Sequence, residues 1–304
     1  MTDESAVLLD GPWTHRTIRA NGIALHVAEL GTGPLILLLH GFPTFWWTWH
    51  RQLIDLADAG YRAVAVDLRG YGGSDKTPRG YDAGTLAADV ASLVTALGER
   101  DAVLVGNDLG GLLAWTVAAQ QPQVVRRIAV LGAAHPLRLR AALAADRTQQ
   151  RALAQLLLAF QLPRYGERQL AHNPAFVRRL FDTWCGPRWR GTPDFVDAVG
   201  RYTDAMTIHP VAHCSLEFFR WAVRSLPRRD GRRYAASMQQ PIRRPVLQLH
   251  GDFDACVLPA TAQGSGQHVS ADYDWRLLTG VGHFPQQEAP DQVSEALIRW
   301  AKLD

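Results

Sequence analysis

The segment Gly106-Asn107-Asp108-Leu109-Gly110 places a carboxylate between two glycines, directly after the apolar run Ala102–Val105. This spacing is typical of a nucleophile held on a sharp turn between a strand and a helix. A carboxylate attacks sp³ carbon that bears a leaving group, and the product is an alkyl ester that water must hydrolyse. The plainer alternative is an ordinary Asp in a glycine-rich loop. A dinucleotide site is excluded because the fingerprint G-x-G-x-x-G is absent and this strand is not the first.

Two further segments could supply a base and its partner. His283 lies in the loop Gly282-His283-Phe284, and Asp254 follows the apolar run Pro245–His250. An Asp just past the end of a buried strand can orient a histidine, and we prefer Asp254 to Asp252 for this role. The chain order of nucleophile, acid and histidine is one that catalytic triads use. The alternatives are a solvated turn carboxylate and a structural histidine.

Backbone donors for an oxyanion are expected beside Asp108. The loop His40-Gly41-Phe42-Pro43 follows the apolar run Leu35–Leu39 and can direct the N–H of Phe42 to the site. The N–H of Leu109 is the second expected donor, and together they would hold the oxyanion formed when water attacks the ester. We interpret His40 and His250 as structural. A strand-end turn without a catalytic role is the alternative for the loop.

The elements that position these residues alternate between strand and helix, which predicts an α/β fold with a mostly parallel sheet flanked by helices. From Pro136 to Pro241 the pattern is helical, and strands then return. We therefore predict one core in two parts, residues 1–135 and 242–304, interrupted by a helical cap at 136–241. The expected strands are Ala24–Leu30, Leu35–Leu39, Arg62–Leu68, Ala102–Val105, Arg127–Leu131, Pro245–His250 and Asp274–Leu278. The expected core helices are Trp46–Ala59, Thr85–Leu97, Gly111–Gln120 and Asp291–Leu303.

Composition excludes several classes of protein. The 304 residues are 47% hydrophobic and 20% charged, which is ordinary for a globular chain, and no apolar run is long enough to span a membrane. Met1–Ser5 lacks the features of a signal peptide, and three widely spaced cysteines indicate neither disulfides nor zinc, so we expect a cytoplasmic protein without a metal. Residues 136–241 hold 17 Arg against 8 Asp and Glu, but the arginines are scattered among apolar residues, which argues against a nucleic-acid partner.

The chain resembles the α/β-hydrolase superfamily and, within it, the branch of epoxide hydrolases and haloalkane dehalogenases. Its nearest resemblance is to actinobacterial epoxide-hydrolase-like proteins. The resemblance implies that Asp108 is the nucleophile, that His283 activates water and that Asp254 is the partner of His283. It rests on His40–Pro43, Phe45-Trp46-Trp47, Asp67–Ser74, Gly106–Gly111, Ala212–Glu217, Gly251–Asp254 and Gly282–Phe284.

Two departures from the family pattern concern the leaving group. Epoxide hydrolases of this type usually carry two cap tyrosines that protonate the leaving alkoxide, and here Ala159 (or Phe160, if the register slips) and Phe219 stand in their places. Haloalkane dehalogenases usually have Trp after the nucleophile, where this chain has Leu109. Substitute donors or pocket walls are sought among Tyr165, Tyr202, His213, Trp46 and Trp47.

These observations predict a hydrolase without a cofactor that acts on a small hydrophobic substrate and water, most plausibly an epoxide hydrolase. Haloalkane dehalogenase or another α/β-hydrolase activity is the first alternative. A non-catalytic, ligand-binding protein of the same fold is the second. The sequence leaves the oligomeric state open, with a homodimer among the options.

Overall fold

An eight-stranded sheet forms the centre of the computed structural model, which describes residues 3–302. The strand order is β1-β2-β4-β3-β5-β6-β7-β8, in which β1, β2 and β4 pair antiparallel and all other neighbours pair parallel. The predicted α/β fold with a mostly parallel sheet is confirmed. The strands are β1 Thr14–Ala20, β2 Ile23–Leu30, β3 Leu35–Leu39, β4 Arg62–Val66, β5 Ala102–Asn107, β6 Val125–Leu131, β7 Val246–Gly251 and β8 Tyr273–Leu278.

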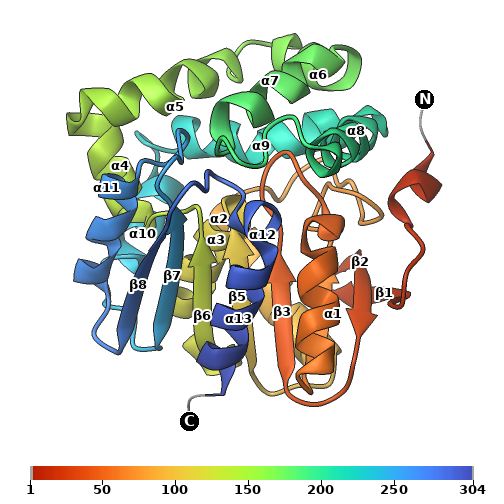
Figure 1. Cartoon of the computed structure of the whole chain (residues 1–304). Coiled ribbons are helices and arrows are strands. Elements are labelled where there is room, and N and C mark those ends of the chain that lie inside the picture. Colours follow the sequence, from red (N-terminus) through yellow and green to blue (C-terminus); the bar gives the residue numbers. More distant parts are fainter. Residues whose placement is uncertain (1–2, 303–304) are drawn as a thin grey trace.

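Burial along the strands follows their place in the sheet. Every residue of the central strands β3 and β5 is buried, because helices cover both faces of the sheet there. The edge strand β1 shows exposed positions along most of its length. Helices α1 and α13 pack together, and α2 packs with α3 (Figure 1). These helices are α1 His50–Asp58, α2 Ala83–Ala96, α3 Leu109–Gln120 and α13 Pro290–Ala301, with the short α11 Pro259–Gln263 and α12 Pro285–Glu288 between β7 and α13.

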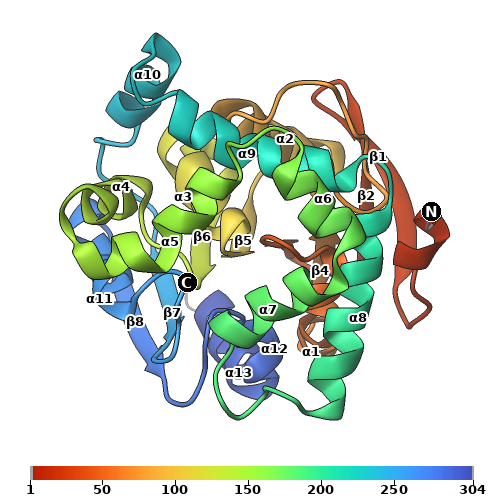
Figure 2. The same cartoon turned by 90° about the horizontal axis from the view of Figure 1, so that it is seen from above.

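Seven helices separate β6 from β7 in the chain, within the range predicted as the cap. Figures 1 and 2 show α5 to α9 stacked over one edge of the sheet, whereas α10 lies beside the core. Helix α10 contacts α3 through the hydroxyls of Tyr234 and Thr116, which are 2.9 Å apart. The helices are α4 Pro136–Ala145, α5 Arg147–Ala159, α6 Tyr165–His172, α7 Pro174–Trp184, α8 Pro193–Thr207, α9 Val211–Arg224 and α10 Arg229–Ser237.

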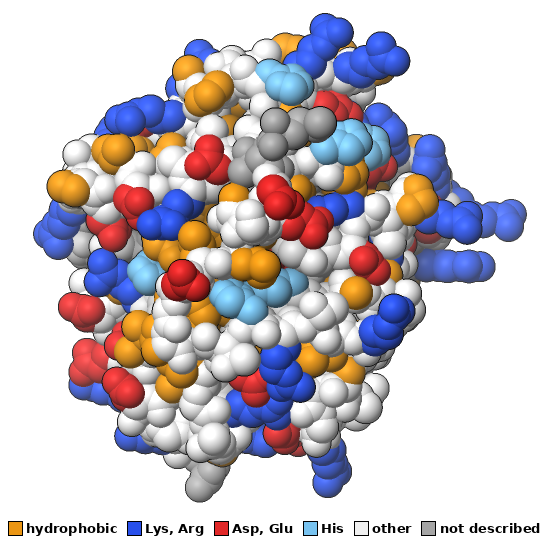
Figure 3. Space-filling model, turned by 90° about the vertical axis from the view of Figure 1, so that its right-hand side faces the viewer, with side chains coloured by type: hydrophobic (Ala, Val, Ile, Leu, Met, Phe, Trp, Pro, Cys, Tyr) orange, Lys and Arg blue, Asp and Glu red, His pale blue; other side chains and the backbone are white. Residues whose placement is uncertain are grey.

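The surface charges, the cysteines and the search for membrane helices and metal sites complete the description of the fold. On the face shown in Figure 3, Lys and Arg side chains lie around the outline and are interspersed with Asp and Glu. Cys185, Cys214 and Cys256 are buried and free. Within residues 3–302 no helix combines the length and apolar character needed to cross a membrane. The same residues contain no cluster of His, Cys, Asp and Glu suited to a metal ion.

Candidate active site

Asp108 occupies a strained turn between β5 and α3. Its backbone has φ 50° and ψ −114°, a conformation that a non-glycine residue adopts only when its surroundings enforce it. The flanking glycines explain how the turn is held. A Cβ on Gly106 would lie 2.2 Å from the carbonyl oxygen of Gly110, and a Cβ on Gly110 would lie 2.1 Å from that of Leu39. The carboxylate therefore projects from a turn that only glycines can close, beside the N-terminus of α3, which favours negative charge.

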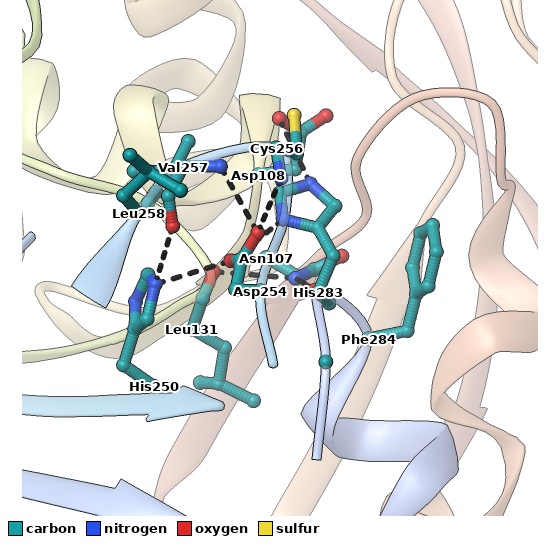
Figure 4. Close-up of polar contacts among 12 residues, drawn as sticks. Asn107, Asp108, Leu131, His250, Asp254, Cys256, Val257, Leu258, His283 and Phe284 are labelled. Atoms are coloured by element: carbon teal, nitrogen blue, oxygen red, sulfur yellow. Dashed lines mark hydrogen bonds and ion pairs between the residues drawn. The ribbon is translucent and has the colours of Figure 1, made fainter. Parts of the chain in front are cut away.

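Three side chains from distant parts of the sequence meet at this turn (Figure 4). His283 Nδ1 lies 2.9 Å from Asp254 Oδ2, and His283 Nε2 lies 3.5 Å from Asp108 Oδ1. The side chains of His283 and Asp254 have no exposed surface, while that of Asp108 is 14% exposed. Among the described residues, His283 Nε2 has no hydrogen-bond partner. The imidazole thus has one nitrogen engaged by Asp254 and the other free toward Asp108.

Asp254 is held as a carboxylate. Its Oδ1 accepts the N–H groups of Cys256 and Val257 at 2.8 and 3.0 Å, and its Oδ2 lies 3.1 Å from Nε2 of His250. Burial alone would raise the pKa of Asp254, but the two histidines lower it well below its usual range. A permanently charged Asp254 fixes the orientation of the His283 ring and stabilises its protonated form.

The same carboxylates act on His283. Burial alone would lower the pKa of His283, but the charge of Asp254 and the contact with Asp108 raise it well above its ordinary value. The ring therefore gains a proton readily while both carboxylates are charged. Once Asp108 is neutralised, one of the groups that raise this pKa is lost.

One of the two expected backbone donors contacts Asp108. The N–H of Phe42 donates to Asp108 Oδ2 at 2.8 Å. Gly41 permits this approach, since a Cβ there would lie 2.5 Å from the Cβ of Asp108. Leu109 is the first residue of α3, so its N–H has no acceptor within the helix. One oxygen of Asp108 thus faces a backbone donor while the other faces His283.

Aromatic side chains cover the Phe42 loop. The ring of Phe219, on α9, lies 5.1 Å from that of Phe42 and 5.7 Å from that of Phe160, and the Phe42 and Phe160 rings are 5.6 Å apart. Phe160 is fully buried and Phe219 is partly buried. Ala159 precedes Phe160 as the last residue of α5 and is also partly buried. None of these side chains carries a hydroxyl, so this wall has no proton donor.

The structure gives the predicted tryptophans and Tyr202 other partners. The indole N–H of Trp46 donates to the carbonyl of Val7 at 2.7 Å, below the N-terminal segment. Trp47 stacks on His50 at 4.1 Å. Tyr202, on α8, is buried and stacks on Phe181 at 5.2 Å. The assignment of Trp46, Trp47 and Tyr202 to the substrate pocket stays a prediction.

Tyr165 and His213 are exposed residues of the helices above the sheet. Tyr165 is 41% exposed at the start of α6. The side chain of His213 is 52% exposed, and its Nδ1 lies 3.2 Å from Oε1 of Glu167. A role for either residue as a proton donor to the leaving group stays a prediction.

Three residues near His283 were missed by sequence reasoning. Asn107 donates to the carbonyl of His283 at 2.9 Å, and Gln286 donates to Asn107 Oδ1 at 3.2 Å. Glu288 binds backbone N–H groups on both sides of His283. The place of Asn107 beside the nucleophile was a usable signal. Gln286 has none, because its partner Asn107 comes from another part of the chain, and the only signal for Glu288 was its nearness to His283.

Comparisons with known proteins identify the fold family of the chain. A family model described as alpha/beta hydrolase fold matches residues 34–290. The AB hydrolase superfamily protein YfhM of Bacillus subtilis is 44% identical over 124 residues, 39% of this chain, and this match spans only 43% of that protein. Epoxide hydrolase 3 of Xenopus tropicalis is 30% identical over 94% of this chain and 77% of its own length. The crystal structure of epoxide hydrolase A from Mycobacterium thermoresistibile superposes with a TM-score of 0.81 at 27% identity, covering 96% of this chain and 99% of that one.

Proposed function

Because the chain belongs to the alpha/beta hydrolase fold family, we propose that it is an epoxide hydrolase that forms a covalent ester on Asp108. One observation carries the proposal. A carboxylate, not a hydroxyl, occupies the strained turn, with one oxygen 2.8 Å from the N–H of Phe42 and the other 3.5 Å from Nε2 of His283. Relatives and solved structures named as epoxide hydrolases give the substrate class.

In the first step, an oxygen of Asp108 attacks a carbon of the epoxide ring. The C–O bond of the ring breaks, its electrons go to the ring oxygen, and the resulting alkoxide takes a proton to become a hydroxyl. The carboxylate becomes an alkyl ester and loses its charge. His283 needs to take no part in forming this bond.

In the second step, His283 Nε2 removes a proton from water while the water oxygen attacks the ester carbon of Asp108. The negative charge that forms on the carbonyl oxygen is received by the N–H groups of Phe42 and Leu109. The bond between the ester carbon and the alkyl oxygen then breaks, and that oxygen takes the proton held by His283. A diol leaves, and Asp108 is restored with one oxygen from water. Asp254 stabilises the protonated His283 in this step.

The aromatic wall favours a second candidate, a haloalkane dehalogenase with the same ester. An alkoxide needs a proton to leave, and positioned acids speed such transfers by about 10²–10⁴-fold. Phe42, Phe160 and Phe219 provide none. A halide leaves without a proton, so this wall would not hinder its departure.

A side-by-side assay separates the candidates. Purified protein is given a panel of hydrophobic epoxides and a panel of bromoalkanes, and diol and bromide are measured. The proposal predicts diol formation that is lost in Asp108→Asn and retained in Asp197→Asn, a matched change at an exposed residue of α8. Bromide without diol would assign the dehalogenase. If the folded protein forms neither diol nor bromide, both candidates are contradicted.

A further inference from the structure

The carboxylate of Glu288, the last residue of α12, binds three backbone N–H groups. It accepts from Gly282 at 2.8 Å and from Phe284 at 3.0 Å, the two neighbours of His283. It also accepts from the N–H of Gly186 at 2.7 Å. Gly186 follows α7 in the helical segment above the sheet. One side chain therefore joins the loop of the proposed base to residues 184–186, here named the cap strap.

The cap strap also holds His283 directly. The N–H of His283 donates to the carbonyl of Trp184 at 2.9 Å, and the Trp184 ring lies edge-on to the imidazole at 5.5 Å. From the other side, Asn107 donates to the carbonyl of His283 at 2.9 Å. The backbone of His283 is therefore held by the core through Asn107 and by the cap strap through Trp184.

The two backbones approach as closely as glycine allows. A Cβ on Gly282 would lie 2.3 Å from the carbonyl oxygen of Trp184. A Cβ on Gly186 would lie 2.4 Å from the carbonyl oxygen of Gly280 and 2.9 Å from Oε2 of Glu288. A shift of the cap strap must therefore move the His283 loop with it.

A charged carboxylate suits this joint, the contact of Glu288 with the cap strap and the His283 loop, because a carboxylate only accepts hydrogen bonds. A glutamine in its place would keep one acceptor oxygen and turn an NH₂ donor toward backbone donors. Among the described residues no cation pairs with Glu288, so its three N–H partners replace the lost hydration of the charge. Each of those partners would be left unsatisfied if the carboxylate were removed.

We propose that Glu288 is a positioning residue that fixes His283 by joining its loop to the cap strap, so that ester hydrolysis depends on this contact. This inference rests on the proposed function. Formation of the ester does not require His283, whereas its hydrolysis requires His283 Nε2 to hold water against the ester carbon. A misplacement of about 1 Å can cost about 10²-fold in rate. A defect at Glu288 is therefore confined to the second step.

The test compares Glu288→Gln with Glu295→Gln, the same change at an exposed residue of α13 that pairs with Arg299. Rapid quenching and intact mass measure ester formation and ester hydrolysis separately. We expect hydrolysis to slow at least about 10-fold in Glu288→Gln, with alkylation nearly unchanged, so that the ester accumulates. Glu295→Gln should match the natural protein. Equal slowing of both steps, or of neither, would overturn the inference.

Gly186→Ala tests the same joint from the cap side. Its added Cβ would separate the cap strap from Gly280 and Glu288, so it should also slow hydrolysis selectively. Thermal unfolding identifies a variant that has lost its fold, in which case Glu288→Gln decides. Normal hydrolysis in a folded Gly186→Ala would count against the joint.

A second readout does not depend on turnover. The ¹⁵N resonances and titration of His283 are recorded by NMR in the natural protein, Glu288→Gln and Glu295→Gln. We expect them to change in Glu288→Gln alone. If the natural protein hydrolyses no epoxide, the proposed function fails, yet this measurement still decides the positioning role. Unchanged His283 resonances in Glu288→Gln would contradict it.

Discussion

Changing Phe219 to Tyr should supply the acid that the aromatic wall lacks. The Phe219 ring lies 5.1 Å from the Phe42 ring, and the N–H of Phe42 lies 2.8 Å from Asp108 Oδ2. A para hydroxyl on Phe219 would therefore add a proton donor to the aromatic wall that packs on Phe42, the residue whose N–H binds Asp108. From there it could protonate the alkoxide as the epoxide ring opens.

The expected gain follows from two opposing effects. Protonation by a positioned acid is worth about 10²–10⁴-fold in rate. A phenol buried without a partner costs about 1–3 kcal/mol of stability, which applies to the free protein before substrate arrives. Phe219 is only partly buried, so the lower end of this cost applies. We expect epoxide turnover to rise at least about 10-fold, the lower bound allowing for imperfect placement of the hydroxyl.

The assay measures diol and bromide production by Phe219→Tyr and by Phe218→Tyr. Phe218 is the neighbour of Phe219 on α9 and contacts Trp221. The control variant Phe218→Tyr therefore places its hydroxyl about 100° away around the helix axis. Diol formation should rise in Phe219→Tyr only, and bromide release should change little. A folded Phe219→Tyr with unchanged diol formation, or an equal rise in Phe218→Tyr, would refute this account of the wall.

Three further outcomes are expected. Since His283 must be neutral to act as base, hydrolysis of the ester in a single turnover should increase with pH; its apparent pKa should be lower than the raised pKa of His283 in the free protein, followed by NMR, because Asp108 is then uncharged. Equal values would count against this. Gly110→Ala should lower the free energy of unfolding by about 1–3 kcal/mol or more, because its Cβ would meet backbone at Leu39. Urea denaturation measures this change, and an unchanged midpoint would contradict the steric argument. Arg220→Met should cost about 2 kcal/mol, less than a fully buried pair, because its two glutamate partners are 23% and 29% exposed; a neutral effect on chemical denaturation would show that the pairs contribute nothing.

The α/β fold and the candidate trio could be predicted because their signals are local. Asp108, Asp254 and His283 each follow a strand end, and parallel strands bring such ends to one edge of a sheet. The glycines around Asp108 and His283 indicate tight turns, and this prediction does not depend on which residues contact them. The assignment of residues 136–241 as a cap stays a prediction, and α10 within that range packs on the core helix α3.

The contacts of larger side chains could not be predicted in the same way. Trp46 follows the Phe42 loop, but its indole lies under the N-terminal segment because Val7 offers a buried carbonyl there. Glu288 binds Gly186, which lies 102 residues earlier in the chain. Local sequence patterns carry no information on such partners, because these contacts depend on how the helices above the sheet pack against the loops of the sheet.

The covalent ester on Asp108 is tested most directly by intact-protein mass spectrometry of His283→Gln mixed with an epoxide. Without the base, ester formation remains open and hydrolysis stalls. We predict an added mass equal to that of the epoxide, mapped to the peptide that contains Asp108 and absent from the double variant with Asp108→Asn. Unmodified protein with the epoxide demonstrably bound, or an adduct on the peptide that contains Cys256 instead, would contradict the mechanism.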